Sequence, residues 1–170
     1  MRRPASGLVL VAALVACSST TTDDPPDTAG RPSVGTSLEG GVGDALRIRG
    51  IGEGEELVVT VLGVTDPAEP PEFGDLSEGS HLVAVEVRLT NTGSAPYNDS
   101  GLNIFRLVDD ADQEHDPDLM SIGEFSDIDL DPGDEQAGEV SFAVADGQEP
   151  KTLQITLGSG FGPETAVWTL

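Results

Sequence analysis

The sequence predicts an all-β fold, an antiparallel β-sandwich of about seven or eight short strands. Residues 81–93, HLVAVEVRLTNTG, place a valine or leucine at every second position, which is typical of a strand with one face in a core. Long runs with apolar residues at helical spacing are almost absent. The 21 glycines and 12 prolines indicate many short elements joined by turns.

The predicted strands follow one another from Asp44 onward. Each shows alternating apolar residues or a β-branched run, and turn residues separate them. The prolines within residues 66–79 predict a loop. Gly63, inside the predicted strand before this loop, indicates either a bulge or a close backbone contact. We expect the last strand to lie at a sheet edge. The predicted strands are residues 45–49, 56–65, 81–90, 103–108, 125–130, 139–144, 152–157 and 165–170.

Residues 1–16 have the features of a secretory signal peptide. Arg2 and Arg3 give a positively charged start. Residues 7–16 then form an apolar run of about ten residues, too short to span a bilayer core, which takes roughly 20. The segment is therefore predicted to direct export and to be removed.

The end of this segment, Leu14-Val15-Ala16-Cys17, resembles the lipobox of bacterial lipoproteins. The resemblance implies that signal peptidase recognises the three residues before the cysteine and cleaves after Ala16. Cys17 would then carry a diacylglyceryl group on its sulfur and become the new N-terminus. A signal peptide that is cleaved elsewhere, with Cys17 as a bystander, is the alternative.

Cys17 is the only cysteine in the chain, so no disulfide can form within the domain. A diacylglyceryl group supplies two acyl chains, the number that stable membrane attachment requires. We therefore expect the protein to be lipid-anchored in the cell membrane and to face the extracytoplasmic side. No cofactor other than this covalent lipid is expected.

Residues 17–43 are predicted to be the lipidated cysteine and a flexible linker. The stretch after Cys17 is rich in Ser, Thr, Pro, Gly and Asp, with only Val34, Leu38 and Val42 as larger apolar residues. Such a composition buries too little surface to offset the entropy of ordering. The predicted organisation is therefore a signal peptide at 1–16, a linker at 17–43 and a β-sandwich domain at 44–170.

The charge balance is strongly acidic, with 8 basic against 31 acidic residues and a net charge of −23. Removal of Arg2 and Arg3 with the signal peptide would leave 6 − 31 = −25. Nucleic acid and anionic lipid surfaces repel such a molecule, because both are bound through Lys and Arg. Nucleic acid is therefore excluded as an expected partner.

Residues 109–118, DDADQEHDPD, form an acidic run that raises the question of a calcium site. Against an EF-hand loop that begins at Asp110, the sixth position holds His115 instead of glycine and the twelfth holds Ser121 instead of glutamate. The run is interpreted as an acidic hairpin turn, with another type of calcium site as the alternative. His81 and His115 are the only histidines, too few for a zinc or copper site, so no metal site is predicted.

No catalytic motif is found. The nearest approach to the G-x-S-x-G of serine hydrolases, residues 35–39, lacks the last glycine and lies in the predicted linker. Residues 50–55, GIGEGE, carry glycines like a phosphate-binding loop, but a glutamate replaces the third glycine and no helix follows. This segment is interpreted as a turn, and the chain is predicted not to be an enzyme.

Several short motifs occur in a defined order: Val59-Thr60-Val61 with Gly63-Val64, Val85-x-Val87 before Asn91-Thr92-Gly93, Phe105-x-Leu107-Val108-Asp109 before Asp116-Pro117, and Leu130-x-Pro132-Gly133-Asp134 before Gly138 and Phe142-x-Val144. Together they resemble a bacterial family of extracytoplasmic immunoglobulin-like domains of unknown function, similar in fold to a secreted mycobacterial immunogenic antigen. The resemblance covers roughly residues 42–157. It implies an immunoglobulin-like sandwich and supplies no activity, because the family has none assigned. The turn after Asp109 departs from the family pattern, since it lacks the usual glycine.

These observations predict a lipid-anchored extracytoplasmic lipoprotein that acts as a non-catalytic binding or structural module at the bacterial cell envelope. The expected partners are the membrane, through the lipid anchor, and an unidentified envelope protein or ligand. The alternative is a calcium- or cation-dependent envelope domain that uses the acidic loop carboxylates.

Overall fold

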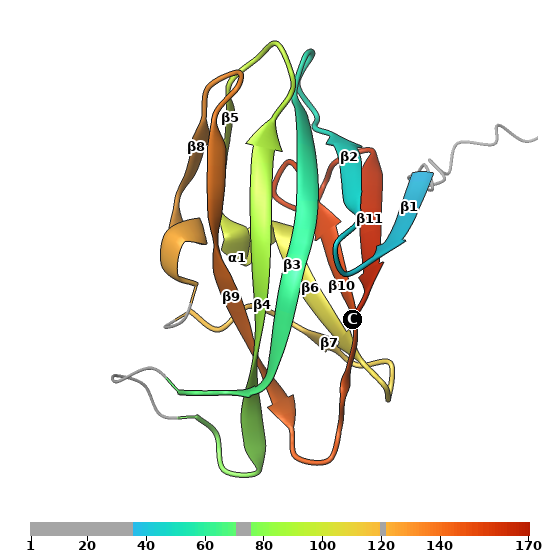
Figure 1. Ribbon diagram of the computed structural model, residues 1–170, viewed down its shortest axis with the longest axis vertical. Helices are drawn as coiled ribbons and strands as arrows, with labels where there is room; N and C mark the ends of the chain where they lie inside the picture. The colour runs from blue at the N-terminus through green and yellow to red at the C-terminus, as the bar shows by residue number, and fades with distance from the viewer. Residues whose placement is uncertain (1–35, 71–75, 120–121) are drawn as a thin grey trace, which may run out of the picture. The chain divides into compact units, whose positions relative to one another are not determined.

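The computed structural model describes residues 36–70, 76–119 and 122–170, which form strands almost throughout (Figure 1). The predicted signal peptide and residues 17–35 of the predicted linker lie outside the described residues. The elements are β1 (Thr36–Gly41), β2 (Ala45–Arg49), β3 (Glu56–Ala68), β4 (Ser80–Asn91), β5 (Tyr97–Asp99), α1 (Gly101–Ile104), β6 (Phe105–Asp109), β7 (Glu114–His115), the 3-10 turn η1 (Gly123–Ser126), β8 (Ile128–Leu130), β9 (Glu135–Ala145), β10 (Pro150–Thr156) and β11 (Glu164–Thr169).

The strands form two larger sheets and a small third sheet. A five-stranded sheet runs in the order β1-β11-β10-β6-β7, and a four-stranded sheet runs in the order β2-β3-β4-β9. The third sheet consists of β5 and β8. Among the described strands every pair is antiparallel except β1 with β11. The predicted all-β sandwich is thereby confirmed.

The hydrophobic core lies between the two larger sheets. The inward positions of β4 are fully buried, as the alternation over residues 81–90 predicts: Val83, Val85, Val87 and Leu89. The five-stranded sheet contributes a matching set with no exposed surface: Phe105, Leu107, Leu153, Ile155 and Trp168. One contiguous cluster contains both sets, so the two sheets share a single core.

The prediction that residues 17–43 are a linker is wrong for its last part. β1 pairs in parallel with β11, in a register that runs from Thr36 opposite Glu164 to Gly41 opposite Thr169. This strand covers an edge of β11 that would otherwise be unpaired, and Leu38 packs against the core. The sheet therefore begins at residue 36 instead of 44. The predicted edge strand at 165–170 is consequently internal, between β1 and β10.

A tight turn connects β1 to β2. Gly43 has a φ of +96°, and the Asp44 carboxylate accepts a hydrogen bond of 2.8 Å from Gly41 N. The Asp44 carbonyl also accepts a 3.0 Å hydrogen bond from Trp168 Nε1. The turn is thus fixed to β11, which explains why a glycine-rich segment becomes ordered here.

Further differences from the predicted elements are local. The predicted strand at 125–130 begins as the 3-10 turn η1. This turn buries the Phe125 ring edge-to-face against the Phe105 ring, with 5.3 Å between the ring centroids. The predicted strand at 103–108 likewise begins as the single turn α1. The bulge predicted at Gly63 is confirmed by a shift in the β3–β4 register. β3 continues to Ala68, into the predicted loop.

We expect a chain that begins at residue 44 to be less stable than one that begins at residue 36. Removing β1 costs the partial burial of Leu38 and leaves the edge of β11 unpaired, a loss of about 2 kcal/mol or more. Urea unfolding followed by Trp168 fluorescence measures the difference. Equal free energies of unfolding would show that β1 does not belong to the folded domain.

Candidate functional site

A pocket of about 540 Å³ opens where the β2–β3 turn, the β4–β5 loop and the β10–β11 loop come together. Its volume falls in the range of small-ligand sites. We call this part of the domain the loop end and define it as residues 49–56, 91–96, 131–134 and 157–164. The pocket lining is polar and rich in glycine: Arg49, Gly50, Gly52, Gly54, Glu55, Glu56, Thr92, Gly93, Ser94 and Pro163.

The β2–β3 turn and the β4–β5 loop are joined backbone to backbone. Gly54 O accepts hydrogen bonds from Ser94 N at 2.9 Å and Ala95 N at 3.2 Å, and Glu56 O accepts from Gly93 N at 3.0 Å. A Cβ atom on Gly93 would lie 2.8 Å from Glu56 N and still closer to Gly54 O. Only glycine therefore allows the two loops to approach this closely.

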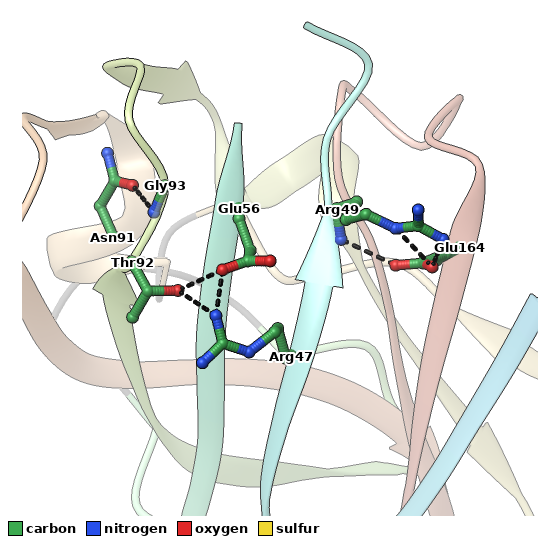
Figure 2. Close-up of polar contacts among 7 residues, drawn as sticks. All are labelled: Arg47, Arg49, Glu56, Asn91, Thr92, Gly93 and Glu164. Carbon is green, nitrogen blue, oxygen red and sulfur yellow. Dashed lines mark hydrogen bonds and ion pairs between the residues drawn. The ribbon is translucent and has the colours of Figure 1, made fainter. Parts of the chain in front are cut away.

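The buried side chain of Asn91 organises the β4–β5 loop. Its amide nitrogen donates to Ala95 O at 2.9 Å and to Leu130 O at 2.8 Å. Its amide oxygen accepts from Gly93 N at 2.9 Å, the bond drawn in Figure 2. Asn91 is itself buried, and these bonds satisfy the polar atoms of its side chain. Asn91 thus fixes one wall of the pocket and connects it to β8.

The turn at residues 131–134 meets the same region. Gly133 has a φ of +96°, as the Pro-Gly pair predicts, and Asp134 N donates to Asp131 O at 2.9 Å. Asn91 N donates to Asp134 O and Asn91 O accepts from Gly133 N, both at 2.9 Å. Two of the motifs that carry the family resemblance therefore meet here and serve the architecture of the loop end.

Two cation–carboxylate contacts border the pocket (Figure 2). In the first, Arg47 forms an ion pair with Glu56 and also approaches Thr92 Oγ1 at 3.3 Å. Thr92 Oγ1 donates to Glu56 Oε1 at 3.0 Å. This cluster connects β2, β3 and the start of the β4–β5 loop on the solvent side.

The second contact joins the two larger sheets. Glu164 at the start of β11 accepts hydrogen bonds from Arg49 N and Arg49 Nε, both at 2.8 Å, and also pairs with Arg49 Nη2 (Figure 2). The Glu164 side chain is 7% exposed, whereas that of Arg49 is 66% exposed. The hydrogen bonds from Arg49 outweigh the effect of burial and hold the pKa of Glu164 below its usual value.

Asp99 and Tyr97 hold the β10–β11 loop. Asp99 Oδ2 accepts from Tyr97 Oη at 2.8 Å and from Ser159 N at 2.6 Å, and Asp99 Oδ1 accepts from Ser159 Oγ at 3.0 Å. Burial, and then the bond to Asp99, raise the pKa of the Tyr97 hydroxyl far above its usual value. Tyr97 therefore stays neutral and acts as a structural donor.

The acidic run at 109–118 forms the β6–β7 hairpin, as predicted. Asp109 is buried, and its carboxylate accepts from Ala111 N at 2.9 Å, from Gln113 N at 2.8 Å and from His115 Nε2 at 2.9 Å. Burial would raise the pKa of Asp109, but these hydrogen bonds outweigh it and lower that pKa. Asp112 adopts a φ of +60° in the turn and so takes the conformation that glycine usually supplies.

Other carboxylates of this run also make structural contacts. Asp112 pairs with Lys151 of the neighbouring strand β10, and Asp116 pairs with Arg106 at 3.0 Å. Within the described ranges no group of three His, Cys, Asp or Glu side chains is arranged to hold a metal ion. His81 lies near the start of β4 with its side chain 20% exposed, and it contacts Asp66 at 3.0 Å.

The residues predicted for lipid attachment and signal peptidase recognition, Leu14, Val15, Ala16 and Cys17, lie outside the described residues. Of the described helices, none is long and apolar enough to cross a membrane. Residues 50–55 form a turn, as predicted, and this turn also lines the pocket, which the sequence did not indicate. The Arg49–Glu164 contact joins residues 115 positions apart, and no local pattern signals it.

The described lining residues of the pocket contain no histidine or cysteine. Thr92 Oγ1 has a carboxylate beside it, that of Glu56, which is also paired with Arg47. The pocket offers a guanidinium, carboxylates, hydroxyls and glycine backbone. This combination suits recognition through hydrogen bonds and charge.

The fold and the loop end define a β-sandwich domain of the immunoglobulin-like type. Residues 52–165, more than half of the 170-residue chain, match a family described as a domain of unknown function (DUF4352), and the chain belongs to this family. The predicted membership of an immunoglobulin-like family of unknown function is thereby confirmed. No curated protein matches the sequence significantly.

Several solved structures share the fold. MPT63, a secreted protein of Mycobacterium tuberculosis, matches with a TM-score of 0.60 and 12% identity over 79% of this chain and 98% of its own. The yjhA protein of Bacillus subtilis matches with a TM-score of 0.53 and 18% identity over 78% and 98%. A candidate lipoprotein of Bacillus subtilis, ycdA, matches with a TM-score of 0.54 and 20% identity over 70% of this chain and 38% of its own. At these identities the similarity concerns the fold alone.

We expect Gly93→Ala to destabilise the domain by about 1–3 kcal/mol, because the added methyl group would force the β2–β3 turn and the β4–β5 loop apart. Gly63→Ala is the matched control, since the nearest atom to its Cβ would be 3.9 Å away. Thermal unfolding of both variants measures the effect. Similar loss in the two variants would mean that strand propensity, and not the contact between the loops, is responsible.

Acid should weaken the Arg49–Glu164 contact. The pKa of Glu164 lies below 4.5 in the folded state, so the stabilisation is present above pH 4.5 and is lost as the pH falls through the folded pKa. Glu164→Gln should therefore lower Tm by roughly 3–5 °C at pH 7, with a smaller difference in more acidic buffer.

Glu69→Gln, at an exposed position in the chain segment after β3, is the control for this titration. It should leave Tm unchanged at both pH values. If the Glu164→Gln difference stayed constant as the pH fell, the contribution of Glu164 would have to come from packing and not from its charge.

Proposed function

We propose that this protein is a lipid-anchored extracytoplasmic lipoprotein that acts as a non-catalytic binding module at the bacterial cell envelope. The observation that carries the anchoring is the lipobox-like sequence Leu14-Val15-Ala16-Cys17 at the end of a short apolar run. The observation that carries binding is the polar pocket at the loop end.

Two further observations support this role. Cys17 is the only cysteine, so it cannot form a disulfide within the chain and its thiol is free for lipid attachment. Proteins of the same fold include a secreted protein and a candidate lipoprotein, which agrees with an extracytoplasmic place for this chain.

The position of β1 changes the proposed tether. Because the sheet begins at Thr36, the segment between Cys17 and the domain comprises residues 18–35. If its composition makes it a random coil, these 18 residues would span on average about 21–25 Å. Fully extended, they would reach roughly 60 Å. The domain would then stay within one or two domain diameters of its lipid.

No contact among the described residues specifically favours the alternative, a calcium- or cation-dependent domain. Its expected ligands in residues 109–118 are engaged in the β6–β7 hairpin, where Asp109 accepts three hydrogen bonds and Asp112 and Asp116 form ion pairs. We therefore retain the binding module as the proposed function.

Cys17→Ser should abolish incorporation of radiolabelled palmitate when the full-length chain is expressed in a bacterium with the lipoprotein pathway. The variant should also move from the membrane fraction to a soluble extracytoplasmic fraction. Ser18→Ala, which leaves the modified residue in place, is the matched control and should keep both the label and the membrane location.

Retention of label by Cys17→Ser would refute attachment at this residue. Recovery of the wild-type chain from the cytosol with residues 1–16 still present, as shown by mass spectrometry, would refute export as well.

A further inference from the structure

Two large apolar side chains stand exposed at the loop end. Phe161 in the β10–β11 loop is 83% exposed, and Ile51 in the β2–β3 turn is 62% exposed. The two loops meet, because a Cβ atom on Gly158 would come within 2.5 Å of Ile51 Cδ1. Exposed apolar side chains of this size gathered in one region are typical of an interaction surface.

The loops that carry these side chains are held in place by hydrogen bonds. Within the β10–β11 loop, Phe161 N donates to Gly158 O at 3.0 Å and Gly162 N donates to Leu157 O at 2.8 Å. Asp99 fixes the same loop through Ser159, as described above. A surface held in this way loses little conformational freedom on binding, which favours affinity.

The charges around these side chains are mainly negative, because Arg47 and Arg49 of β2 are each paired with a glutamate. The turns and loops at 50–55, 92–96, 131–134 and 157–163 contain four acidic residues and no lysine or arginine: Glu53, Glu55, Asp131 and Asp134. The nearest arginine that lines the pocket, Arg49, is paired with Glu164. The loop end that carries the exposed apolar pair is therefore acidic in composition, and it repels anions and attracts cations.

The negative charge discriminates between the partners that an exposed phenylalanine and isoleucine could bind. Anionic lipid headgroups would be repelled by the four carboxylates. A second copy of the chain would bring the same carboxylates face to face, because a two-fold interface places like surfaces together. A protein with basic residues around an apolar recess is complementary both to the exposed apolar side chains and to the negative charge around them.

We propose that the loop end docks a protein partner that offers an apolar recess bordered by Lys or Arg side chains. Phe161 and Ile51 enter the recess, and a basic side chain of the partner lies in the neighbouring pocket beside the Glu55 carboxylate, which also accepts a 2.8 Å hydrogen bond from Gly52 N. This inference rests on the proposed role as a binding module and specifies the chemistry of the partner. It does not depend on lipid attachment at Cys17.

Site-specific photo-cross-linking tests the proposal in the producing bacterium. The full-length chain carries p-benzoylphenylalanine in place of Phe161, and a matched chain carries it in place of Leu119, which is 67% exposed and lies outside the loop end. Irradiation should give a discrete adduct from position 161 alone. Mass spectrometry should map the cross-link to an apolar segment flanked by Lys or Arg.

The cross-linked partner is then purified and its affinity for the full-length chain is measured. Phe161→Ser should weaken binding at least about tenfold, as expected for an aromatic anchor, and Ile51→Ser should weaken it severalfold. Leu119→Ser should leave the affinity unchanged. Raising the salt concentration from about 0.05 M to about 0.5 M should weaken binding of the unaltered chain.

The proposal would be overturned by an adduct with lipid, an adduct with a second copy of the chain, an acidic partner segment, equal cross-linking from both positions, or no adduct at all. It would also be overturned if neither Phe161→Ser nor salt changed the affinity for the partner. Palmitate labelling of the same strain, scored separately, distinguishes a failure of anchoring from a failure of docking.

Discussion

Burial of apolar side chains between two sheets, with no covalent link between them, is the constraint on which this structure depends. The single cysteine precedes the domain, so no disulfide can join the sheets. Noncovalent contacts must close the side of the sandwich where β2 approaches β11. Trp168 bonded to the Asp44 carbonyl, and Arg49 bonded to Glu164, do so. The second of these contacts also borders the pocket, so the stability of the sandwich and the shape of the candidate site rest on the same ion pair.

The residues that signal family membership serve the architecture. Asn91 satisfies three backbone groups, Gly93 permits the contact between two loops, and Gly133 completes the turn that bonds back to Asn91. These positions explain why chains of this kind share a fold. They say little about a ligand, because their polar atoms are already engaged within the domain. The features that would select a partner, Phe161 and Ile51, lie in loops outside the motifs.

Local patterns predicted most of the sandwich. Alternation with a period of two was sufficient for β2, β3, β4, β9 and β10, because their inward side chains are large and aliphatic. β1 was missed, since it has one sizeable apolar residue and its partner β11 lies more than 120 residues later. β5 and β7 are too short to show a period. The pocket could not be predicted either, because it is formed by glycine backbone and by Arg49 paired with a distant glutamate.

The parallel pairing of β1 has a steric consequence for a tethered molecule. Thr36 lies opposite Glu164, so β1 begins at the end of the sheet where β11 begins (Figure 1). The β10–β11 loop, which carries Phe161 and contributes Pro163 to the pocket, leads into β11 at this end. If the domain is tethered through residues 18–35 and docks through the loop end as proposed, attachment and recognition lie at the same end of the domain. If residues 18–35 connect this end to a lipid, a docked protein must fit into the space that those 18 residues can span. The length of the connecting segment would then act as a size filter, admitting slender partners and excluding bulky ones.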